Sequence, residues 1–201
     1  LRVVWLQATV LVCAYTSYKA FDQYALFAVR GHGIDEIEAA QIVATGAWTR
    51  PIAALALGLL GDRFGISRIA LLCFVLLIIS HSLFAFTGTA LGTLSMILLN
   101  TLVTGIAIFG LRGLYFGLFE EGQIPLALTG TAVGLVSVIG YTPDVYIAAV
   151  AGYLIDQSPG LAGFQHLFMV LLGFSVVGAI AAIGFERQAR AASVTAGVNS
   201  P

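Results

Sequence analysis

The sequence predicts an all-α membrane protein with six transmembrane helices and little chain outside them. Hydrophobic residues make up 59% of the 201 residues, charged residues only 9%, and the mean hydropathy is +0.99. A soluble domain carries about a quarter charged residues, so this chain is too apolar to fold in water. A hydrocarbon core about 30 Å thick needs roughly 20 apolar residues per helix, which leaves room for six spans and short loops.

Six apolar runs define the expected helices. We expect them at residues 3–29, 38–60, 68–87, 91–117, 124–155 and 162–185. The segments between them carry glycine, proline or charge, as in GDRFGIS at 61–67 and DQSPGLAG at 156–163. Residues 1–186 then form one six-helix domain, and 187–201 form a polar, frayed cytoplasmic tail.

Four of the six runs carry embedded polar residues. The first has Tyr15, Lys19 and Asp22, the second Arg50, the fourth Asn100 and Arg112, and the fifth Tyr141 and Asp144. The third and sixth are apolar nearly all round and are expected at the lipid-facing periphery. The first, second, fourth and fifth helices should therefore line something wet or buried.

The polar pattern recurs every three helices, which predicts two three-helix repeats. TRP at 49–51 interrupts the second run, and TPD at 142–144 interrupts the fifth. Proline interruptions at corresponding positions of two repeats are the best sequence indication of a transporter's binding site.

Arginines in the short loops predict the orientation. One set of helix ends holds Arg2, Arg63, Arg68, Arg112, Arg187 and Arg190, whereas the other holds Arg30 beside Asp35, Glu36 and Glu38. Cytoplasmic loops carry the excess of arginine and lysine. We therefore expect an integral protein of a bacterial inner (plasma) membrane with both termini cytoplasmic. Because the chain begins at Leu1, without methionine, and enters a span almost at once, we also expect a fragment of a longer protein.

The segment GLLGDRFG at 58–65 carries a family resemblance. Gly58, Asp62, Arg63 and Gly65, followed by Arg68, resemble the Gly-x-x-x-Asp-Arg-x-Gly loop signature of the major facilitator superfamily. In that family the signature lies between the second and third helices of each six-helix half. Ile66 and Ser67 stand where basic residues usually follow, a departure more typical of the carboxyl-terminal half.

The resemblance extends along the chain, since GTAVGLVSVIGYTPD at 130–144 is similar to the eleventh helix of such transporters. It implies half of a twelve-helix major facilitator fold, with the amino-terminal six-helix half missing as a partner. It also implies a cytoplasmic latch at the loop motif, whose charges engage neighbouring helix ends in one access state. The alternative is a plain capped turn, in which Asp62 caps the start of the third helix.

Depth distinguishes the embedded charges. Arg50 lies about 19 Å from the outer end of its helix, and Lys19 and Asp144 about 15–18 Å from theirs. A charge at that depth costs several kcal/mol, so each is expected to face a cavity or a partner. Asp144 should be neutralised by Lys19 or Arg50, which lie at similar depth. The family resemblance favours Lys19, because it implies that the first and fifth helices lie side by side. Arg112, about 31 Å from the outer end, should extend to the cytoplasmic interface as a gate residue.

These residues predict a secondary active transporter, by symport or antiport. Arg50, Lys19, Asp144, Tyr15 and Asn100 are the candidate cavity residues, and the fixed cations favour a small anionic solute such as an organic or sugar acid. A coupled proton or sodium ion and the lipid bilayer are the other expected partners. A proton-coupled exporter of cationic or amphipathic compounds and a non-transporting membrane scaffold stay open as alternatives.

Other function classes lack the residues they need. The chain has no Gly-x-Ser-x-Gly element and no His-Glu-x-x-His element, so an enzyme is not expected and no catalytic residue is assigned. No cofactor and no metal site are expected either. With a net charge of −1 and few clustered basic residues, the chain does not suit nucleic acid.

Overall fold

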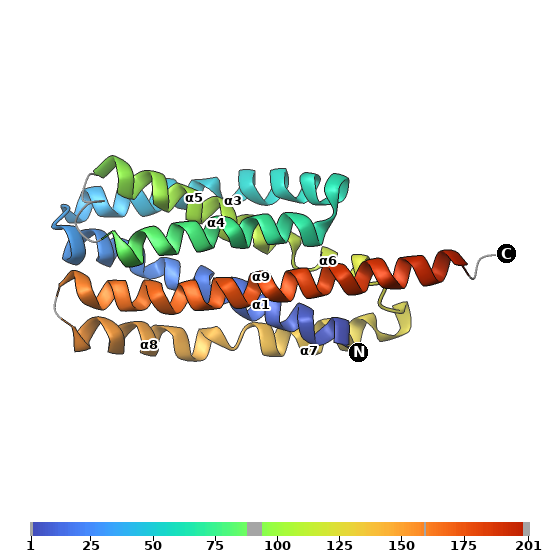
Figure 1. The fold of residues 1–201 in the computed structure, drawn as a ribbon. Helices are drawn as coiled ribbons and strands as arrows, with labels where there is room; N and C mark the ends of the chain where they lie inside the picture. The colour runs from blue at the N-terminus through green and yellow to red at the C-terminus, as the bar shows by residue number, and fades with distance from the viewer. Residues whose placement is uncertain (1, 88–93, 159, 199–201) are drawn as a thin grey trace.

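In a computed structural model, the chain forms a bundle of long helices that lie side by side (Figure 1). The structure describes residues 2–87, 94–158 and 160–198. Among these, five helical segments are long and apolar enough to cross a membrane: Glu36–Phe64, Ile66–Phe86, Leu94–Leu114, Ala127–Gln157 and Leu161–Ala191. The predicted class, an all-helical integral membrane protein, is confirmed.

The first helical segment changes helix type near its middle. Helix α1, Arg2–Ala20, is followed by a 3₁₀ turn at Phe21–Gln23, a short helix α2 at Tyr24–Leu26 and a π turn at Phe27–Gly31. This segment lies beside the other spans but is less apolar than they are, so a sixth span and the arrangement in two repeats stay predictions. Such departures from α-helix inside a helical segment often mark functional positions.

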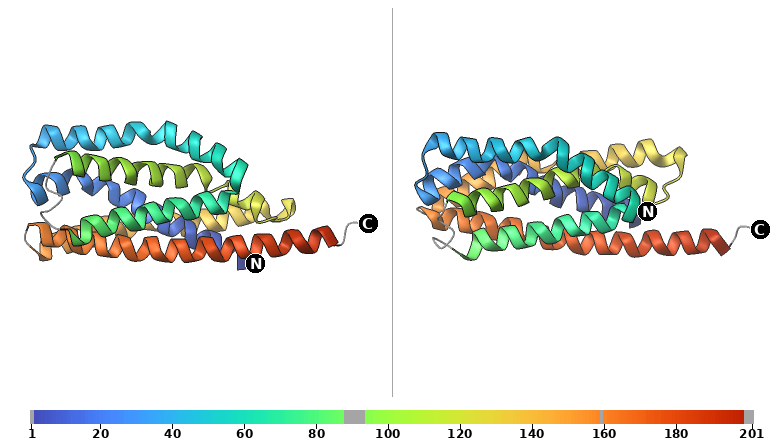
Figure 2. Two further views of the ribbon diagram at one scale, coloured as in Figure 1. Left: turned by 45° about the horizontal axis from the view of Figure 1, so that its top comes forward. Right: turned by 90° about the horizontal axis from the view of Figure 1, so that it is seen from above.

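Helix α3, Glu36–Phe64, is continuous through Pro51, so the predicted break at TRP is wrong. Proline removes one backbone hydrogen bond and bends a helix, but packing against neighbours can hold the helix together. The left view of Figure 2 shows α3 bowed along its length. Its first turn is capped by Asp35, which accepts a hydrogen bond of 2.9 Å from the Ile37 amide.

Helix α4, Ile66–Phe86, begins after Gly65, whose φ of +101° is a conformation that suits glycine. Next come α5, Leu94–Leu114, and the short α6, Gly117–Glu121. The predicted start of the fourth helix at residue 91 lies outside the described residues.

The fifth predicted span is divided into two helices, α7 at Leu126–Gly140 and α8 at Pro143–Gln157. The predicted interruption at TPD is therefore confirmed. Pro143 stands in the first turn of α8, where its missing N–H costs nothing. Asp144 consequently lies at the start of a helix in the middle of the bundle.

Helix α9, Leu161–Val198, continues well beyond the predicted end at residue 185. The described part of the predicted tail is therefore helical, and the expectation of a frayed tail is wrong there. The segment ERQARAA at 186–192 consists of good helix formers, and Arg190 pairs with Glu186 one turn earlier.

The interior of the bundle is built mainly by α4, α5 and α9, together with α1. In the most apolar stretch of α4, half of the residues are buried, compared with 22% in α3 and 22% in the α7–α8 segment. The two apolar helices expected at the periphery, α4 and α9, pack closely on each other. Helices α3 and α7–α8, which carry embedded polar residues, are more exposed than α4, α5 and α9. Their exposed side chains can contact water or another part of the protein.

Both ends of the described chain lie at one end of the bundle. The start of α1 and the end of α9 lie there, as does the turn between α3 and α4, whereas the turn between η2 and α3 lies at the opposite end (Figure 1). This arrangement matches the predicted pattern of loops, and a cytoplasmic location of the end with both termini stays a prediction from the arginine distribution.

We therefore predict that Glu36→Cys reacts with an impermeant thiol reagent on intact cells, whereas Glu120→Cys reacts only after permeabilisation. Both side chains are exposed, at opposite ends of the bundle. The background carries Cys13→Ala and Cys73→Ala, which remove two buried free thiols. Labelling of Glu120→Cys alone on intact cells would reverse the orientation.

Candidate functional site

Charged and aromatic side chains from α1, α3, α5 and α8 form a continuous series of contacts, which we call the embedded strip. Its members are Tyr15, Tyr18, Lys19, Arg50, Phe109, Arg112 and Asp144. The four spans that the sequence predicted to line a common region thus contribute to one surface. Tyr15, Lys19, Arg50 and Asp144, four of the predicted cavity residues, belong to it.

An ion pair joins α1 to α8. The Lys19 ammonium lies 3.2 Å from one carboxylate oxygen of Asp144, and the Tyr15 hydroxyl donates a hydrogen bond of 2.8 Å to the other. Asp22, one turn after Lys19, lies 3.8 Å from the same ammonium. The predicted neutralisation of Asp144 by Lys19 is confirmed, and Lys19 bridges two carboxylates.

The ion pair is only partly covered by this chain. The side chain of Lys19 is 31% exposed and that of Asp144 is 46% exposed. Asp144 also lies in the first turn of α8, where the helix dipole favours a carboxylate. Lys19 lies in the last turn of α1, two residues before the 3₁₀ turn, so both members of the ion pair stand next to an interruption of regular α-helix.

The two arginines of the strip stack on aromatic rings. The Arg50 guanidinium carbon lies 4.8 Å from the Phe109 ring centre, and that of Arg112 lies 4.1 Å from the ring of Tyr18. Tyr18 in turn contacts Tyr15, with 5.3 Å between ring centres. Such cation–π contacts hold a guanidinium in place while leaving its N–H groups able to bind a ligand.

Two predicted residues differ from their expected placement. Arg112 turns towards Tyr18 in the embedded strip, so the predicted extension to the cytoplasmic interface is wrong. A ring on the neighbouring helix offers the guanidinium a partner within the bundle. Asn100 is buried between α5 and α4, where its side-chain amide donates 3.2 Å to the Ser80 carbonyl. It ties two helices together and does not belong to the strip.

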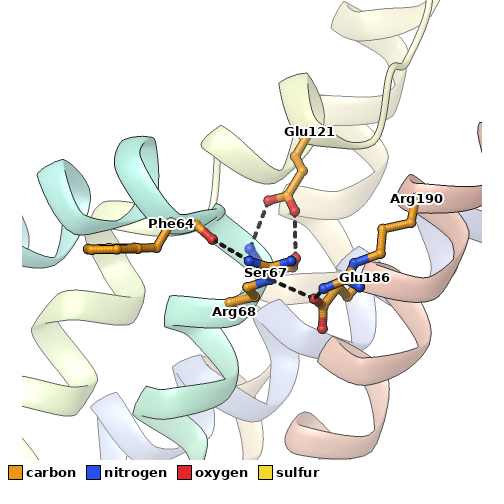
Figure 3. Close-up of polar contacts among 6 residues, drawn as sticks. All are labelled: Phe64, Ser67, Arg68, Glu121, Glu186 and Arg190. Carbon is orange, nitrogen blue, oxygen red and sulfur yellow. Dashed lines mark hydrogen bonds and ion pairs between the residues drawn. The ribbon is translucent and has the colours of Figure 1, made fainter. Parts of the chain in front are cut away.

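A second group of polar contacts lies near the turn between α3 and α4, and we call it the end cluster (Figure 3). Glu121 of α6 accepts a hydrogen bond of 2.7 Å from the Ser67 amide and one of 2.5 Å from the Ser67 hydroxyl. Arg68 of α4 donates to Glu186 of α9 at 2.9 Å, and Arg190 pairs with the same carboxylate. The cluster therefore joins α4 to α6 and to α9.

Glu121, and not Asp62, caps the start of α4. Asp62 is exposed in the last turn of α3, because that helix runs on to Phe64, so the predicted capping by Asp62 is wrong. Glu121 approaches the free amides of the first turn of α4, a favourable position for a carboxylate. The neighbouring Glu120 is exposed, whereas Glu121 is partly buried.

The other motif residues have separate positions. Arg63 lies over the ring of the adjacent Phe64 at 5.3 Å, and Gly65 supplies the turn. Gly58 lies on α3 with no atom within 4 Å of where a Cβ would be, so packing in this chain does not require glycine there. Asp62 and Glu120 line one hollow of about 470 Å³ beside the turn.

Several contributors were missed at the sequence level. Tyr18 and Phe109, which hold the two arginines, look like ordinary aromatic residues of apolar helices. Tyr18 stands one turn after Tyr15, a spacing that places both rings on one helix face and could have indicated it. The spacing of four residues could have indicated the pairing of Glu186 with Arg190, but not its pairing with Arg68, which is 118 residues away in the sequence.

Comparisons with known proteins give distant relatives. The chain is 23% identical over 188 residues to the inner membrane protein YqcE of Escherichia coli (strain K12), which covers 89% of the chain and 44% of that protein. It is 32% identical over 83 residues to the inner membrane protein YihN of the same organism, covering 41% of the chain and 20% of that protein. No protein-family model matches. The chain thus spans less than half the length of these relatives.

We predict that Lys19 and Asp144 are energetically coupled. Asp144→Asn should lower the melting temperature of the purified full-length protein, because it leaves the Lys19 charge without its closest partner. Adding Lys19→Met should restore part of the loss, so that the two substitutions are not additive in a double-mutant cycle. Strictly additive effects of the two substitutions would show that the pair does not contribute.

We also predict that Glu121→Ala destabilises the protein more than Glu120→Ala. Loss of a helix cap costs about 0.5–2 kcal/mol, and only Glu121 contacts the first turn of α4. Thermal unfolding of the two variants side by side measures the difference, because they remove the same group from neighbouring positions. Equal melting temperatures of the two variants would show that Glu121 does not stabilise the start of α4.

Proposed function

We propose that this chain is one six-helix half of a secondary active transporter of the major facilitator kind, which moves a small polar solute by alternating access. The observation that carries the proposal is the embedded strip, in which one continuous series of contacts joins charged side chains of α1, α3, α5 and α8. The other half of the protein would supply the facing wall of a solute cavity.

The strip is unsuited to lipid contact. Lys19 and Asp144 are partly exposed, and Arg50 and Arg112 are exposed. A charge at the centre of a bilayer costs several kcal/mol unless it faces water or protein. The strip therefore requires a water-filled cavity or a second body of protein against it, and a solute pathway between two halves supplies both.

Helix α3 also carries an exposed apolar face. Trp48 is 78% exposed and Ile52 is 71% exposed, and Leu55 and Leu59 continue the same face. Arg50 stands two residues from both Trp48 and Ile52, so it lies on the other side of the helix, over the Phe109 ring of α5. The apolar face therefore suits contact with lipid, and the side that carries Arg50 is the one that we assign to the solute pathway.

The charges of the strip favour an anionic solute. Lys19 is already engaged by Asp144 and Asp22, but the guanidinium groups of Arg50 and Arg112 stack on rings without a carboxylate contact in the described structure. A guanidinium offers five donors in a planar fork, which matches a carboxylate in two-point fashion. An organic or sugar acid fits this arrangement better than a cation.

The end cluster supports a conformational latch. It joins α4 to α6 and α9 through Glu121, Arg68 and Glu186, beside the Gly-x-x-x-Asp-Arg-x-Gly segment. Surface ion pairs of this type contribute little each, so a change of state could break them at small cost. The two relatives are both called inner membrane proteins, which supports the same location for this chain.

The transport proposal is tested with the full-length protein reconstituted into liposomes. We expect uptake of one or more hydroxy-acid or sugar-acid anions from a labelled panel, stimulated by a proton or sodium gradient, and no uptake of the matched neutral sugars. Flux of cationic amphipathic dyes instead would favour the exporter alternative. Absence of any flux with correctly folded protein would favour a scaffold.

We predict that Arg50→Lys separates solute binding from structure. Lysine keeps the charge but loses the planar fork and the flat stacking on Phe109. The variant should reach the membrane and melt within a few degrees of the parent, yet lose at least nine-tenths of uptake of the anion identified above. Arg30→Lys, at the outer end of the bundle, serves as the control. Near-normal uptake by Arg50→Lys would remove Arg50 from the site.

A further inference from the structure

An apolar groove lies on the bundle where α1, α7 and α9 meet, and none of the strip residues lines it. Its volume is about 520 Å³, within the range of about 300–1,000 Å³ typical of ligand sites. The lining consists of Trp5, Ala8, Thr9, Val12, Cys13, Ile139, Val170, Gly173, Phe174 and Val177. The Thr9 hydroxyl is turned to the Trp5 carbonyl at 2.9 Å, so the groove presents almost purely apolar surface.

The groove has a depth that fits one leaflet of a bilayer. Helix α9 enters the membrane at Leu161, so Val170 lies about 14 Å from that end, close to the midplane at 1.5 Å per residue. Val177 and Trp5 lie progressively nearer to the end of the bundle that holds the start of α1 and the end of α9. An acyl chain that enters from that end would lie along the groove and stop at mid-membrane.

The mouth of the groove is basic. A second hollow of about 300 Å³, lined by Arg2, Trp5, Leu6, Thr9 and Gln188, shares Trp5 and Thr9 with the groove. Arg2 is exposed in this hollow, and Arg187, which directly precedes Gln188 in α9, is also exposed. The nearby carboxylate Glu186 faces α4 and is paired with Arg68 and Arg190 (Figure 3). Positive charge at the end of an apolar groove is complementary to a phosphate attached to acyl chains.

A missing side chain keeps the groove open. Gly173 lines it, and a Cβ added there would meet no atom within 4 Å. Space at this position is therefore available to a ligand and could be filled without a clash.

We propose that this groove binds one anionic glycerophospholipid from the leaflet on the side of the chain termini, with an acyl chain along α1 and α9 and its phosphate at Arg2. The interaction joins apolar burial to an electrostatic contact at the interface, the two contributions that hold amphipathic molecules at membranes. It is independent of the transport proposal, because the groove and the embedded strip share no residue.

The test uses purified, delipidated full-length protein and native mass spectrometry with phosphatidylglycerol or phosphatidylcholine of identical acyl chains. The parent should bind phosphatidylglycerol at one site at least fivefold more tightly than phosphatidylcholine. Gly173→Leu should weaken that binding at least fivefold, whereas Gly152→Leu, where a Cβ also meets no atom within 4 Å, should leave it unchanged. Arg2→Gln should reduce the headgroup preference to less than twofold, and Arg30→Gln should preserve it.

A smaller substitution guards against misfolding. Gly173→Cys, in a background with Cys13→Ala and Cys73→Ala, should be alkylated by N-ethylmaleimide at least fivefold more slowly when phosphatidylglycerol is present. Parent-like lipid binding by Gly173→Leu, or alkylation of Gly173→Cys that phosphatidylglycerol does not slow, overturns the site. Equal binding of both lipids by the parent, or an unchanged preference in Arg2→Gln, overturns the anionic headgroup and leaves a groove filled by any acyl chain.

Discussion

A charge on a membrane-spanning helix must meet a counter-charge, an aromatic ring or water, and this constraint organises the polar part of the molecule. Lys19 satisfies it through two carboxylates, and Arg50 and Arg112 through the rings of Phe109 and Tyr18. The partners come from different helices: Asp144 from α8, Phe109 from α5 and Tyr18 from α1. The same contacts that make the charges tolerable therefore fix how α1, α3, α5 and α8 stand relative to one another.

The two polar regions of the molecule differ in what they can tolerate. In the embedded strip, Asp144 has both Lys19 and Tyr15 as partners, and Lys19 has both Asp144 and Asp22, so the loss of one contact leaves another in place. In the end cluster, Arg68 and Arg190 are 55% and 61% exposed, and water can replace Glu186 as their partner. A protein built in this way can rearrange at its end while the arrangement of charges in its middle persists.

Much of the architecture was predictable because a bilayer demands long apolar helices, and these are legible in sequence. The Lys19–Asp144 pair was predictable from equal depth, and the break before Pro143 from proline chemistry. Pro51 shows the limit of that chemistry, since α3 continues through it where packing compensates. Arg112 and Glu121 could not be placed from local sequence, because their partners come from helices that only the tertiary fold brings near.

The interruption at residues 141–142 leaves α7 and α8 with 15 residues each. A rod of that length measures about 22 Å, shorter than the hydrocarbon core of about 30 Å. Neither helix can cross alone, and sliding one past the other would expose unbonded backbone groups to lipid, which is forbidden at that depth. Helices α7 and α8 must therefore stay end to end, and the interruption between them allows bending but not separation. Asp144 lies in the first turn of α8, next to this interruption. A tilt of α8 about the interruption therefore moves the Asp144 carboxylate much less than it moves the far end of the helix.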